Sequence, residues 1–339
     1  NRGIEGEAAI DRYLNGTLDD LYDPMLLKDM ERAVSILCEA VDTGKKIRIV
    51  GDYDIDGVCS TYILLQAFER LGSDVDFEIP DRIKDGYGIN ESIIEQAHAD
   101  GVEVILTCDN GISAFHQVEL AKKYGMTVVI TDHHEVPLDG EKEKIPPADA
   151  VIDPKQADCP YPFPEICGAV VAYKLVQVLY ARRGVPQMEW LDLLEFAAIA
   201  TVGDVMKLQD ENRILVKYGL KKMAQTKNLG LRRLAEKNNL DLGAITAYHI
   251  GFVIGPCLNA GGRLKTAKEA LALLRAQSEE EAERLAEELK ELNDTRKDMT
   301  EQGTEAAKLQ VESWYQKDKV LVVFLPECHE SLAGIIAGR

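Results

Sequence analysis

Apolar residues in the first half of the chain follow two spacings, one typical of short buried strands and one typical of amphipathic helices. Strand-like runs occupy 46–50, 75–80, 103–107, 127–131 and 149–152, and helical spacing occupies 24–43, 58–71, 90–99 and 113–124. Strands that alternate with helices predict a parallel sheet flanked by helices. From about residue 165 to about 313 the pattern is almost wholly helical. We therefore predict an α/β domain with a helical extension.

The last part of the chain predicts a change of organisation. Residues 279–312 carry 12 acidic and 5 basic side chains, and Leu285, Leu289 and Leu292 lie at helical spacing. Such a charged helix with a thin apolar stripe either connects two domains or lies on the surface of the first. The run VLVVFL at 320–325 predicts a buried strand that opens a second α/β domain. We expect a catalytic domain at 1–264, connecting helices at 265–313, and the beginning of an incomplete second domain at 314–339.

Composition narrows the class of protein. The 339 residues include 58 acidic and 39 basic side chains, for a formal charge of −19, and seven cysteines without a CxxC pair. With no long apolar run and no signal-peptide pattern at the start, we expect a reduced, cytoplasmic protein without membrane contact. The net charge argues against a nucleic-acid partner. However, residues 213–239 hold eight basic side chains and one acidic one. They form either a solvated helical face or a DNA-facing one.

Polar residues follow the predicted strands where each strand ends. The first strand leads into Gly51–Gly57 (GDYDIDG), the third into Asp109-Asn110-Gly111, the fourth into Asp132-His133-His134, and the last into Asp153. Ligands of parallel α/β sheets bind at this edge. Clustered carboxylates with imidazoles suit divalent Mn²⁺ or Mg²⁺. A calcium loop of the EF-hand type is excluded, because the twelfth position is Ile63 instead of Glu.

As a set, these motifs resemble a known family. GDYDIDG (51–57), DNGIS (109–113), TDHHEVP (131–137) and ATVGDV (200–205) are similar to the motifs of the DHH phosphoesterases. DRIKDGYG (81–88), ENR (211–213) and GPCLNAGGR (255–263) resemble the RecJ-type single-strand-specific exonucleases within that family. HESLAGIIAGR (329–339) resembles the opening of the DHHA1 domain, which a long helix joins to the DHH domain in this family.

The resemblance implies roles for particular residues. The metal ligands would be Asp54, Asp56, Asp109, His133 and Asp204. His134 would be a catalytic, phosphate-facing residue, with Asp132 and Asp52 supporting the metal ligands. Only the resemblance singles out Asp204, because a lone Asp in a helical region is usually a cap or a surface residue. The candidate substrate contacts are Arg82, Asn259, Gly261, Gly262, Arg263 and His329, with Tyr87 as a further one. Asn259 to Arg263 would let the backbone approach a nucleotide closely.

The resemblance also implies an activity. It is the 5′-to-3′ hydrolysis of single-stranded DNA to 5′ mononucleotides with two divalent cations, Mn²⁺ or Mg²⁺, in DNA repair and recombination. Expected partners are single-stranded DNA and a single-strand-binding protein or a helicase, with the protein itself a monomer. One alternative is a DHH phosphodiesterase that acts on short oligoribonucleotides or cyclic dinucleotides. A scaffold that has lost its metal ligands is a second alternative, but this chain retains all five.

Overall fold

A five-stranded parallel sheet forms the centre of the first half of the chain. The computed structural model describes residues 4–83, 86, 88–315 and 319–338. The strands lie in the order β2-β1-β3-β4-β7 and are all parallel, as predicted. Their bounds are β1 (Ile47–Val50), β2 (Val75–Glu78), β3 (Val104–Cys108), β4 (Thr127–Thr131) and β7 (Ala150–Ile152). A short antiparallel hairpin, β5 (Leu138–Asp139) with β6 (Lys142–Glu143), was not predicted.

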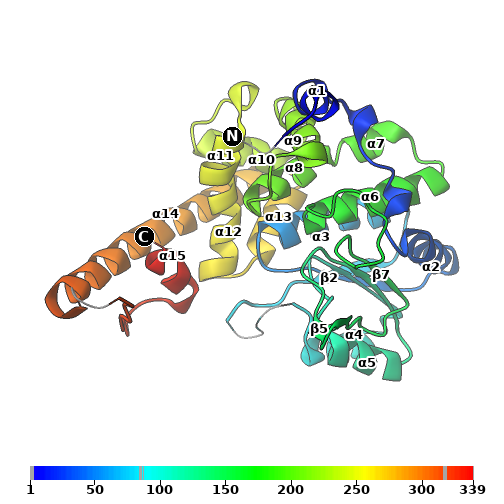
Figure 1. Cartoon of the computed structure of the whole chain (residues 1–339), viewed down its shortest axis with the longest axis horizontal. Coiled ribbons are helices and arrows are strands. Elements are labelled where there is room, and N and C mark those ends of the chain that lie inside the picture. The colour runs from blue at the N-terminus through cyan, green and yellow to red at the C-terminus, as the bar shows by residue number, and fades with distance from the viewer. Residues whose placement is uncertain (1–3, 84–85, 87, 316–318, 339) are drawn as a thin grey trace.

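Helices cover both faces of this sheet, because the strands are apolar on both sides. Figure 1 shows α4 (Glu91–Ala99) and α5 (Phe115–Lys123) below the sheet, with α2 (Met30–Thr43), α3 (Ile55–Arg70) and α6 (Gly168–Arg182) above it. Along β1, Ile47 and Ile49 belong to the core with α2, α3 and α6, whereas Val50 belongs to the core with α4 and α5. Successive side chains of a strand point to opposite faces. The predicted helices over this region are confirmed.

The chain after residue 165 is helical, also as predicted. Helix α8 is apolar on all sides and packs against α3, α6 and α9, so it is buried at the centre of this part. It ends at Asp204. The bounds are α7 (Gln187–Leu191), α8 (Leu194–Gly203), α9 (Asp210–Met223), α10 (Leu229–Lys237), α11 (Ala247–His249), a π-helical turn (Ile250–Ile254), α12 (Gly255–Leu264) and α13 (Lys268–Arg275). A helix at the N-terminus, α1 (Glu7–Asn15), packs against α9.

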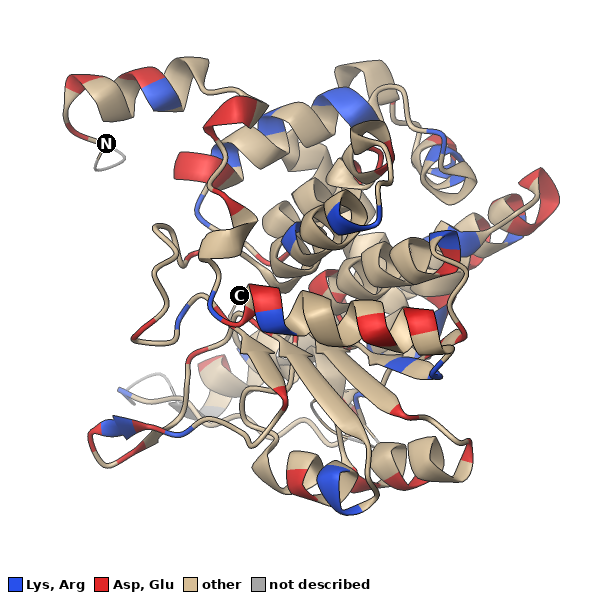
Figure 2. Ribbon diagram, turned by 90° about the vertical axis from the view of Figure 1, so that its right-hand side faces the viewer, with Lys and Arg blue, Asp and Glu red and all other residues tan. Residues whose placement is uncertain are grey.

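The first half of the long charged helix α14 (Glu279–Gln310) lies on the surface of the helical region, one of the two predicted arrangements, whereas its role as a connector between domains stays a prediction. Its first half packs on α10, α12 and α13, and its second half extends away from the sheet to contact α15 (Ala333–Ala337) (Figure 1). Basic residues of α10 pair with its acidic residues, since Arg232 and Arg233 bind Glu279 and Lys237 binds Glu283 and Glu287. Figure 2 shows acidic and basic residues interspersed along the helices. Much of the basic 213–239 stretch therefore takes part in ion pairs within the protein.

The predicted buried strand at 320–325 is wrong. Residues 321–325 have no strand assignment, and Val322 and Phe324 are exposed. Among the described residues no strand lies beside this segment to accept its backbone hydrogen bonds, and no apolar layer covers it.

Tyr87 and Arg339 lie outside the described residues. The division into domains at 264 and 313 stays a prediction. No helix in the described ranges is long and apolar enough to cross a membrane.

Candidate metal centre

Acidic and imidazole side chains from four segments meet at the carboxyl edge of the sheet. Three groups each have ligand atoms within 4.8 Å of one another, and together they use seven side chains. The groups are Asp52, Asp54 and Asp109; Asp56, His133 and Asp204; and Asp109, His133 and His134. Asp52 and Asp54 lie between β1 and α3, Asp56 lies in the first turn of α3, Asp109 follows β3, the histidines follow β4, and Asp204 ends α8. The structure therefore brings together all the residues that the sequence singled out as metal ligands.

The two aspartates of α3 are fixed by helix N-termini. Asp54 caps α3, and its Oδ1 accepts from the backbone N–H groups of Asp56 and Gly57 at 2.9 and 3.1 Å. The carboxylate of Asp56 lies at the start of α6, where it accepts from the N–H groups of Gly168 and Ala169 at 2.7 Å each. Free N–H groups and the helix dipole favour an anion at such a position. These two hydrogen bonds therefore fix the side chain of Asp56 in one orientation.

Gly168 lets α6 approach this close to the site. A Cβ atom at position 168 would lie 2.7 Å from the Cβ of Asp109 and 2.9 Å from its Cα. Both distances are shorter than non-bonded carbon atoms allow. A glycine is therefore required where α6 meets the segment after β3. The sequence analysis did not identify this residue, because its role depends on a contact between segments 59 positions apart.

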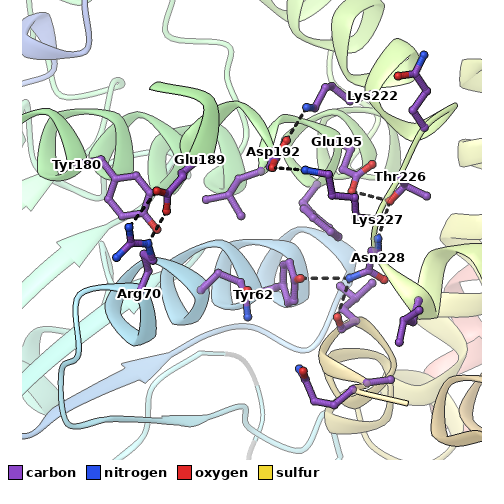
Figure 3. Close-up of a pocket in the computed structure, with 18 residues that line it drawn as sticks. Tyr62, Arg70, Tyr180, Glu189, Asp192, Glu195, Lys222, Thr226, Lys227 and Asn228 are labelled. Carbon is purple, nitrogen blue, oxygen red and sulfur yellow. Dashed lines mark hydrogen bonds and ion pairs between the residues drawn. The ribbon is translucent and has the colours of Figure 1, made fainter. Parts of the chain in front are cut away.

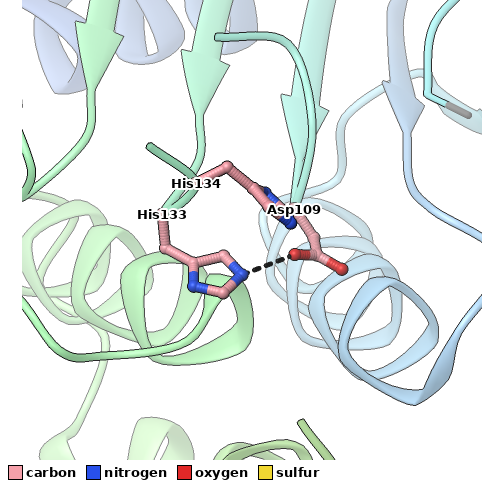
Figure 4. A group of neighbouring side chains, drawn as sticks. All are labelled: Asp109, His133 and His134. Atoms are coloured by element: carbon pink, nitrogen blue, oxygen red, sulfur yellow. Dashed lines mark hydrogen bonds and ion pairs between the residues drawn. The ribbon is translucent and has the colours of Figure 1, made fainter. Parts of the chain in front are cut away.

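The side chains of Asp109 and His133 meet from two different strand ends. Asp109 Oδ1 lies 3.0 Å from His133 Nε2 (Figure 4), and the same nitrogen lies 3.4 Å from Asp56 Oδ2 and 3.9 Å from Asp204 Oδ2. Asp109 has a φ of 61°, in the left-handed region that Asp and Asn tolerate better than most residues. Neighbouring Asn110 donates to the carbonyls of Val50 and Cys108 at 3.0 and 2.9 Å and so ties the ends of β1 and β3 together.

Asp132 orients His134 and accepts hydrogen bonds at both of its carboxylate oxygens. It accepts from the backbone N–H groups of Ile112, His133 and His134, and its Oδ1 lies 2.7 Å from His134 Nδ1. Burial favours the neutral acid, but the hydrogen bond and charge of His134 outweigh it and lower the pKa of Asp132. Burial likewise opposes the charge of His134, yet the bond to Asp132 raises its pKa to about 9. The pair is therefore an ionised carboxylate with an imidazolium.

The remaining carboxylates repel one another. Burial and the charge of Asp56 raise the pKa of Asp109 well above its usual value. Burial and the charge of Asp54 raise the pKa of Asp52 to about 7, and burial and the charge of Asp56 do the same for Asp204. Asp52 Oδ1 has no hydrogen-bond partner among the described residues. Such a set of oxygens and one imidazole fits hard divalent cations, which would replace the protons.

Asp153 is a further acidic residue at this edge. The sequence analysis placed it at the end of the last strand but gave it no role. Its side chain is fully buried, and its Oδ1 accepts from the N–H of Lys155 at 2.8 Å. Burial and the charge of Asp132 raise its pKa to about 7. Its position at a strand end was the only signal that could have singled it out.

The candidate phosphate contacts lie on the side of α12. The guanidinium of Arg82 lies 4.6 Å from the centre of the Tyr53 ring. Arg263 Nη1 donates to the carbonyl of Ser331 at 2.9 Å, and the Ser331 hydroxyl, 2.8 Å from His329 Nδ1, donates to the carbonyl of Arg263. Burial and then Arg82 lower the pKa of Arg263, whereas the charge of Asp54 opposes this change. Arg263 and His329 are thus joined through Ser331.

Two glycines of α12 lie close to the backbone of neighbouring segments. A Cβ atom at Gly262 would lie 2.3 Å from the Tyr53 carbonyl oxygen, and one at Gly261 would lie 2.8 Å from that of Thr266. Both residues are buried in the helix. They allow α12 to pack against the protein's own backbone, and their predicted contact with a nucleotide stays a prediction. Asn259 is only partly buried, but its Oδ1 is buried without a partner among the described residues.

A separate cavity of about 460 Å³ lies at the opposite ends of α3 and α8 (Figure 3). None of the predicted metal ligands or substrate contacts lines it, although Lys222 and Lys227 of the basic 213–239 stretch do. Its charged side chains pair with one another, since Arg70 binds Glu189 and Asp192 binds Lys222 and Lys227. The metal-site residues Asp54 and Asp204 lie at the other ends of the same helices. The cavity therefore does not belong to the candidate metal centre.

Comparison with known proteins identifies the family. Residues 46–201 match the DHH family, N-terminal domain. The chain is 37% identical over 338 residues to the single-stranded-DNA-specific exonuclease RecJ of Bacillus subtilis, covering 100% of this chain and 42% of that protein. A crystal structure of exonuclease RecJ bound to manganese superimposes with a TM-score of 0.82 at 34% identity, covering 92% of this chain and 77% of that chain. This chain belongs to the RecJ group of the DHH family.

The family assignment confirms the resemblance seen in the sequence and the α/β fold class. A RecJ structure in complex with Mg²⁺ from Thermus thermophilus is also similar, with a TM-score of 0.69 at 30% identity over 97% of this chain and 44% of that one. The chain spans less than two thirds of the curated RecJ proteins that match its whole length, with 42% and 60% for two of them.

Proposed function

We propose that this chain carries the catalytic centre of a metal-dependent exonuclease that degrades single-stranded DNA from the 5′ end to 5′ mononucleotides, in DNA repair and recombination. The observation that carries the proposal is the meeting of Asp54, Asp56, Asp109, His133 and Asp204 at one edge of the sheet. The names of the RecJ relatives, which are single-stranded-DNA-specific exonucleases, support the substrate class.

Two divalent cations, Mn²⁺ or Mg²⁺, are the proposed cofactors. Two of the three donor groups share Asp109 and two share His133, so neighbouring ions can use common ligands. Similar RecJ structures are described as bound to manganese and to Mg²⁺. Bound ions supply positive charge for a phosphodiester and lower the pKa of a water molecule that attacks it. The buried carboxylates repel one another in the protein alone. Two divalent cations would balance their negative charge.

The other polar residues are proposed to hold the phosphate. His134, kept protonated by Asp132, can donate a hydrogen bond to a phosphate oxygen. Arg263 and Arg82 add positive charge on the side of Asp54 and Tyr53. His329 lies in the segment of Ser331, which contacts Arg263, and is proposed to hold the phosphate together with that arginine. A single-strand-binding protein or a helicase as a partner, and a monomeric state, stay predictions.

A substrate panel tests the proposal. The substrates are a 5′-phosphorylated single strand of DNA, the matching duplex, a single strand of RNA and a cyclic dinucleotide, each with Mn²⁺ and with Mg²⁺. We expect mononucleotide release from the DNA single strand above all, and none in EDTA. Asp109→Asn should abolish release, whereas Asp139→Asn, on the exposed β5–β6 hairpin, should not. Preferential cleavage of RNA or of the cyclic dinucleotide would contradict the proposed substrate.

A further inference from the structure

One helical rod links the surface of the protein to the candidate phosphate contacts. Helix α11, the π-helical turn and α12 run without a break from Ala247 to Leu264. Eight of the 18 positions of the rod are buried, including Ile250, Ile254 and Leu258. A stripe at spacings of three and four residues stays accessible: Tyr248, Phe252, Pro256, Asn259 and Arg263. Residues at this spacing share one helix face, so the stripe leads from Tyr248 to Arg263.

The outer end of the stripe is an exposed pair of stacked aromatic rings. Tyr248 is 64% exposed and Phe252 is 68% exposed. Their ring centroids lie 4.8 Å apart, with 25° between the ring planes. Large apolar side chains gathered on a surface indicate a binding function more often than single ones do. The π-helical turn that presents Phe252 is a rare conformation that occurs often at functional sites.

The rod packs directly on the metal-ligating segments. A Cβ atom at Gly251 would lie 3.6 Å from a γ-carbon of Val202, two residues before Asp204. A Cβ atom at Gly255 would lie 3.3 Å from the side chain of Ile55, which stands between Asp54 and Asp56. At about 1.5 Å per residue, Phe252 lies about 16 Å along the rod from Arg263. The aromatic pair is therefore close enough to contact the same bound chain as the metal centre, a few units away.

We propose that Tyr248 and Phe252 form a stacking platform for the bases of a single-stranded nucleic acid whose backbone follows the stripe to Arg263. This inference rests on the proposed function and names how the substrate is held. Every base has a π-face, so stacking on aromatic rings binds single strands without requiring a particular sequence. In a duplex the bases are already stacked on one another. The platform therefore favours single strands over duplexes before any bond is cleaved.

Binding in EDTA tests the platform apart from catalysis. The probe is fluorescein-labelled oligothymidylate, and its anisotropy is followed during titration with the whole chain at fixed salt. The variant Tyr248→Ala/Phe252→Ala should bind about tenfold more weakly or worse. The variant Tyr248→Phe/Phe252→Tyr keeps both rings and should bind as the unchanged chain does. An abasic strand of the same length should bind equally to all of these proteins.

Tyr124→Ala is the matched control. Tyr124 is 37% exposed and stacks on His98 with centroids 4.3 Å apart, but it lies just before β4, at the opposite edge of the sheet. Its loss should leave binding unchanged. The platform would be overturned if Tyr248→Ala/Phe252→Ala bound oligothymidylate as tightly as the unchanged chain does. It would also be overturned if this variant lost as much affinity for the abasic strand. Absence of metal-dependent cleavage together with ring-dependent binding would instead reject the proposed function and leave the platform standing.

Discussion

Buried carboxylates in this protein behave in opposite ways, according to the donors that each one meets. Asp132 accepts several hydrogen bonds and pairs with His134, so its pKa is lowered despite complete burial. Burial, and then the charges of Asp56 and Asp54, raise the pKa of Asp109. Asp132 is thus stable as an anion in the protein alone, whereas Asp109 requires a proton or a cation. This contrast supports a positioning role for Asp132 and a ligand role for Asp109.

Glu195 gives a test of this reasoning away from the metal centre. It is 5% exposed, and its Oε1 accepts from the Thr226 hydroxyl at 2.7 Å (Figure 3), while burial raises its pKa to about 7. A raised pKa means that stability is lost as the pH rises from the unfolded value of about 4.5 through 7. In urea unfolding at pH 8, Glu195→Gln should be more stable by about 2–3 kcal/mol, with little difference near pH 4.5. Equal stability at both pH values would contradict the account.

At the residue scale, the sequence predicted those site residues that directly follow strands. Asp54, Asp109 and His133 follow β1, β3 and β4, and the carboxyl ends of parallel strands all lie at one edge of the sheet. Asp204 ends a helix that is apolar on all sides, and no local pattern marks it as a ligand. Gly168 acts through a contact with Asp109 that only the folded chain creates. The packing of Gly261 and Gly262 against the backbone of Thr266 and Tyr53 likewise depends on contacts that only the folded chain creates.

At the scale of elements, the start of α6 is the part that positions the site most directly. Gly168→Ala would place a methyl group 2.7 Å from Asp109, so α6 must shift and its hydrogen bonds to Asp56 must lengthen. We expect a stability cost of about 1–3 kcal/mol and a much smaller rise of the unfolding midpoint on addition of Mn²⁺. Gly334→Ala in α15, where a Cβ atom meets nothing within 4 Å, is the control. An unchanged response of Gly168→Ala to Mn²⁺ would contradict this role.

Periodicity predicted the elements of the first half because each apolar run had a neighbour to pack on. The run at 320–325 has the same composition as those strands but no neighbouring strand among the described residues, and it is not a strand. The π-helical turn at Ile250–Ile254 was not predicted either, because the sequence pattern indicates only a helix there. For the run at 320–325, tertiary contacts and not local propensity decided the structure.

At the scale of the whole molecule, two regions supply a large part of the net charge of −19. One is the acidic helix α14, whose first half is compensated by basic residues of α10. The other is the metal centre, whose carboxylates are concentrated at one buried edge. The charge therefore does not exclude a nucleic-acid substrate, because divalent ions would neutralise the part that faces it.

Metal binding should depend on pH in a defined direction. The raised pKa values of Asp52 and Asp204, both about 7, mean that the metal-free protein loses stability as the pH rises through 7. Cations compete with these protons, so the stabilisation by Mn²⁺, about 2.7 kcal/mol at a hundredfold excess over Kd, should be larger at pH 8 than at pH 6. Thermal unfolding with Mn²⁺ and with EDTA measures it. A larger effect at pH 6 would show that these carboxylates do not bind the ion.

The central claim is that the cluster around Asp109 is a metal-dependent nuclease centre. The most direct test measures mononucleotide release from 5′-phosphorylated single-stranded DNA as a function of Mn²⁺ concentration, in the unchanged chain and in Asp109→Asn. Asn tolerates the left-handed backbone at this position, so the variant should fold. We predict saturable, Mn²⁺-dependent release by the unchanged chain and none by the variant. Equal release by both proteins, or release that does not depend on Mn²⁺, would contradict the claim.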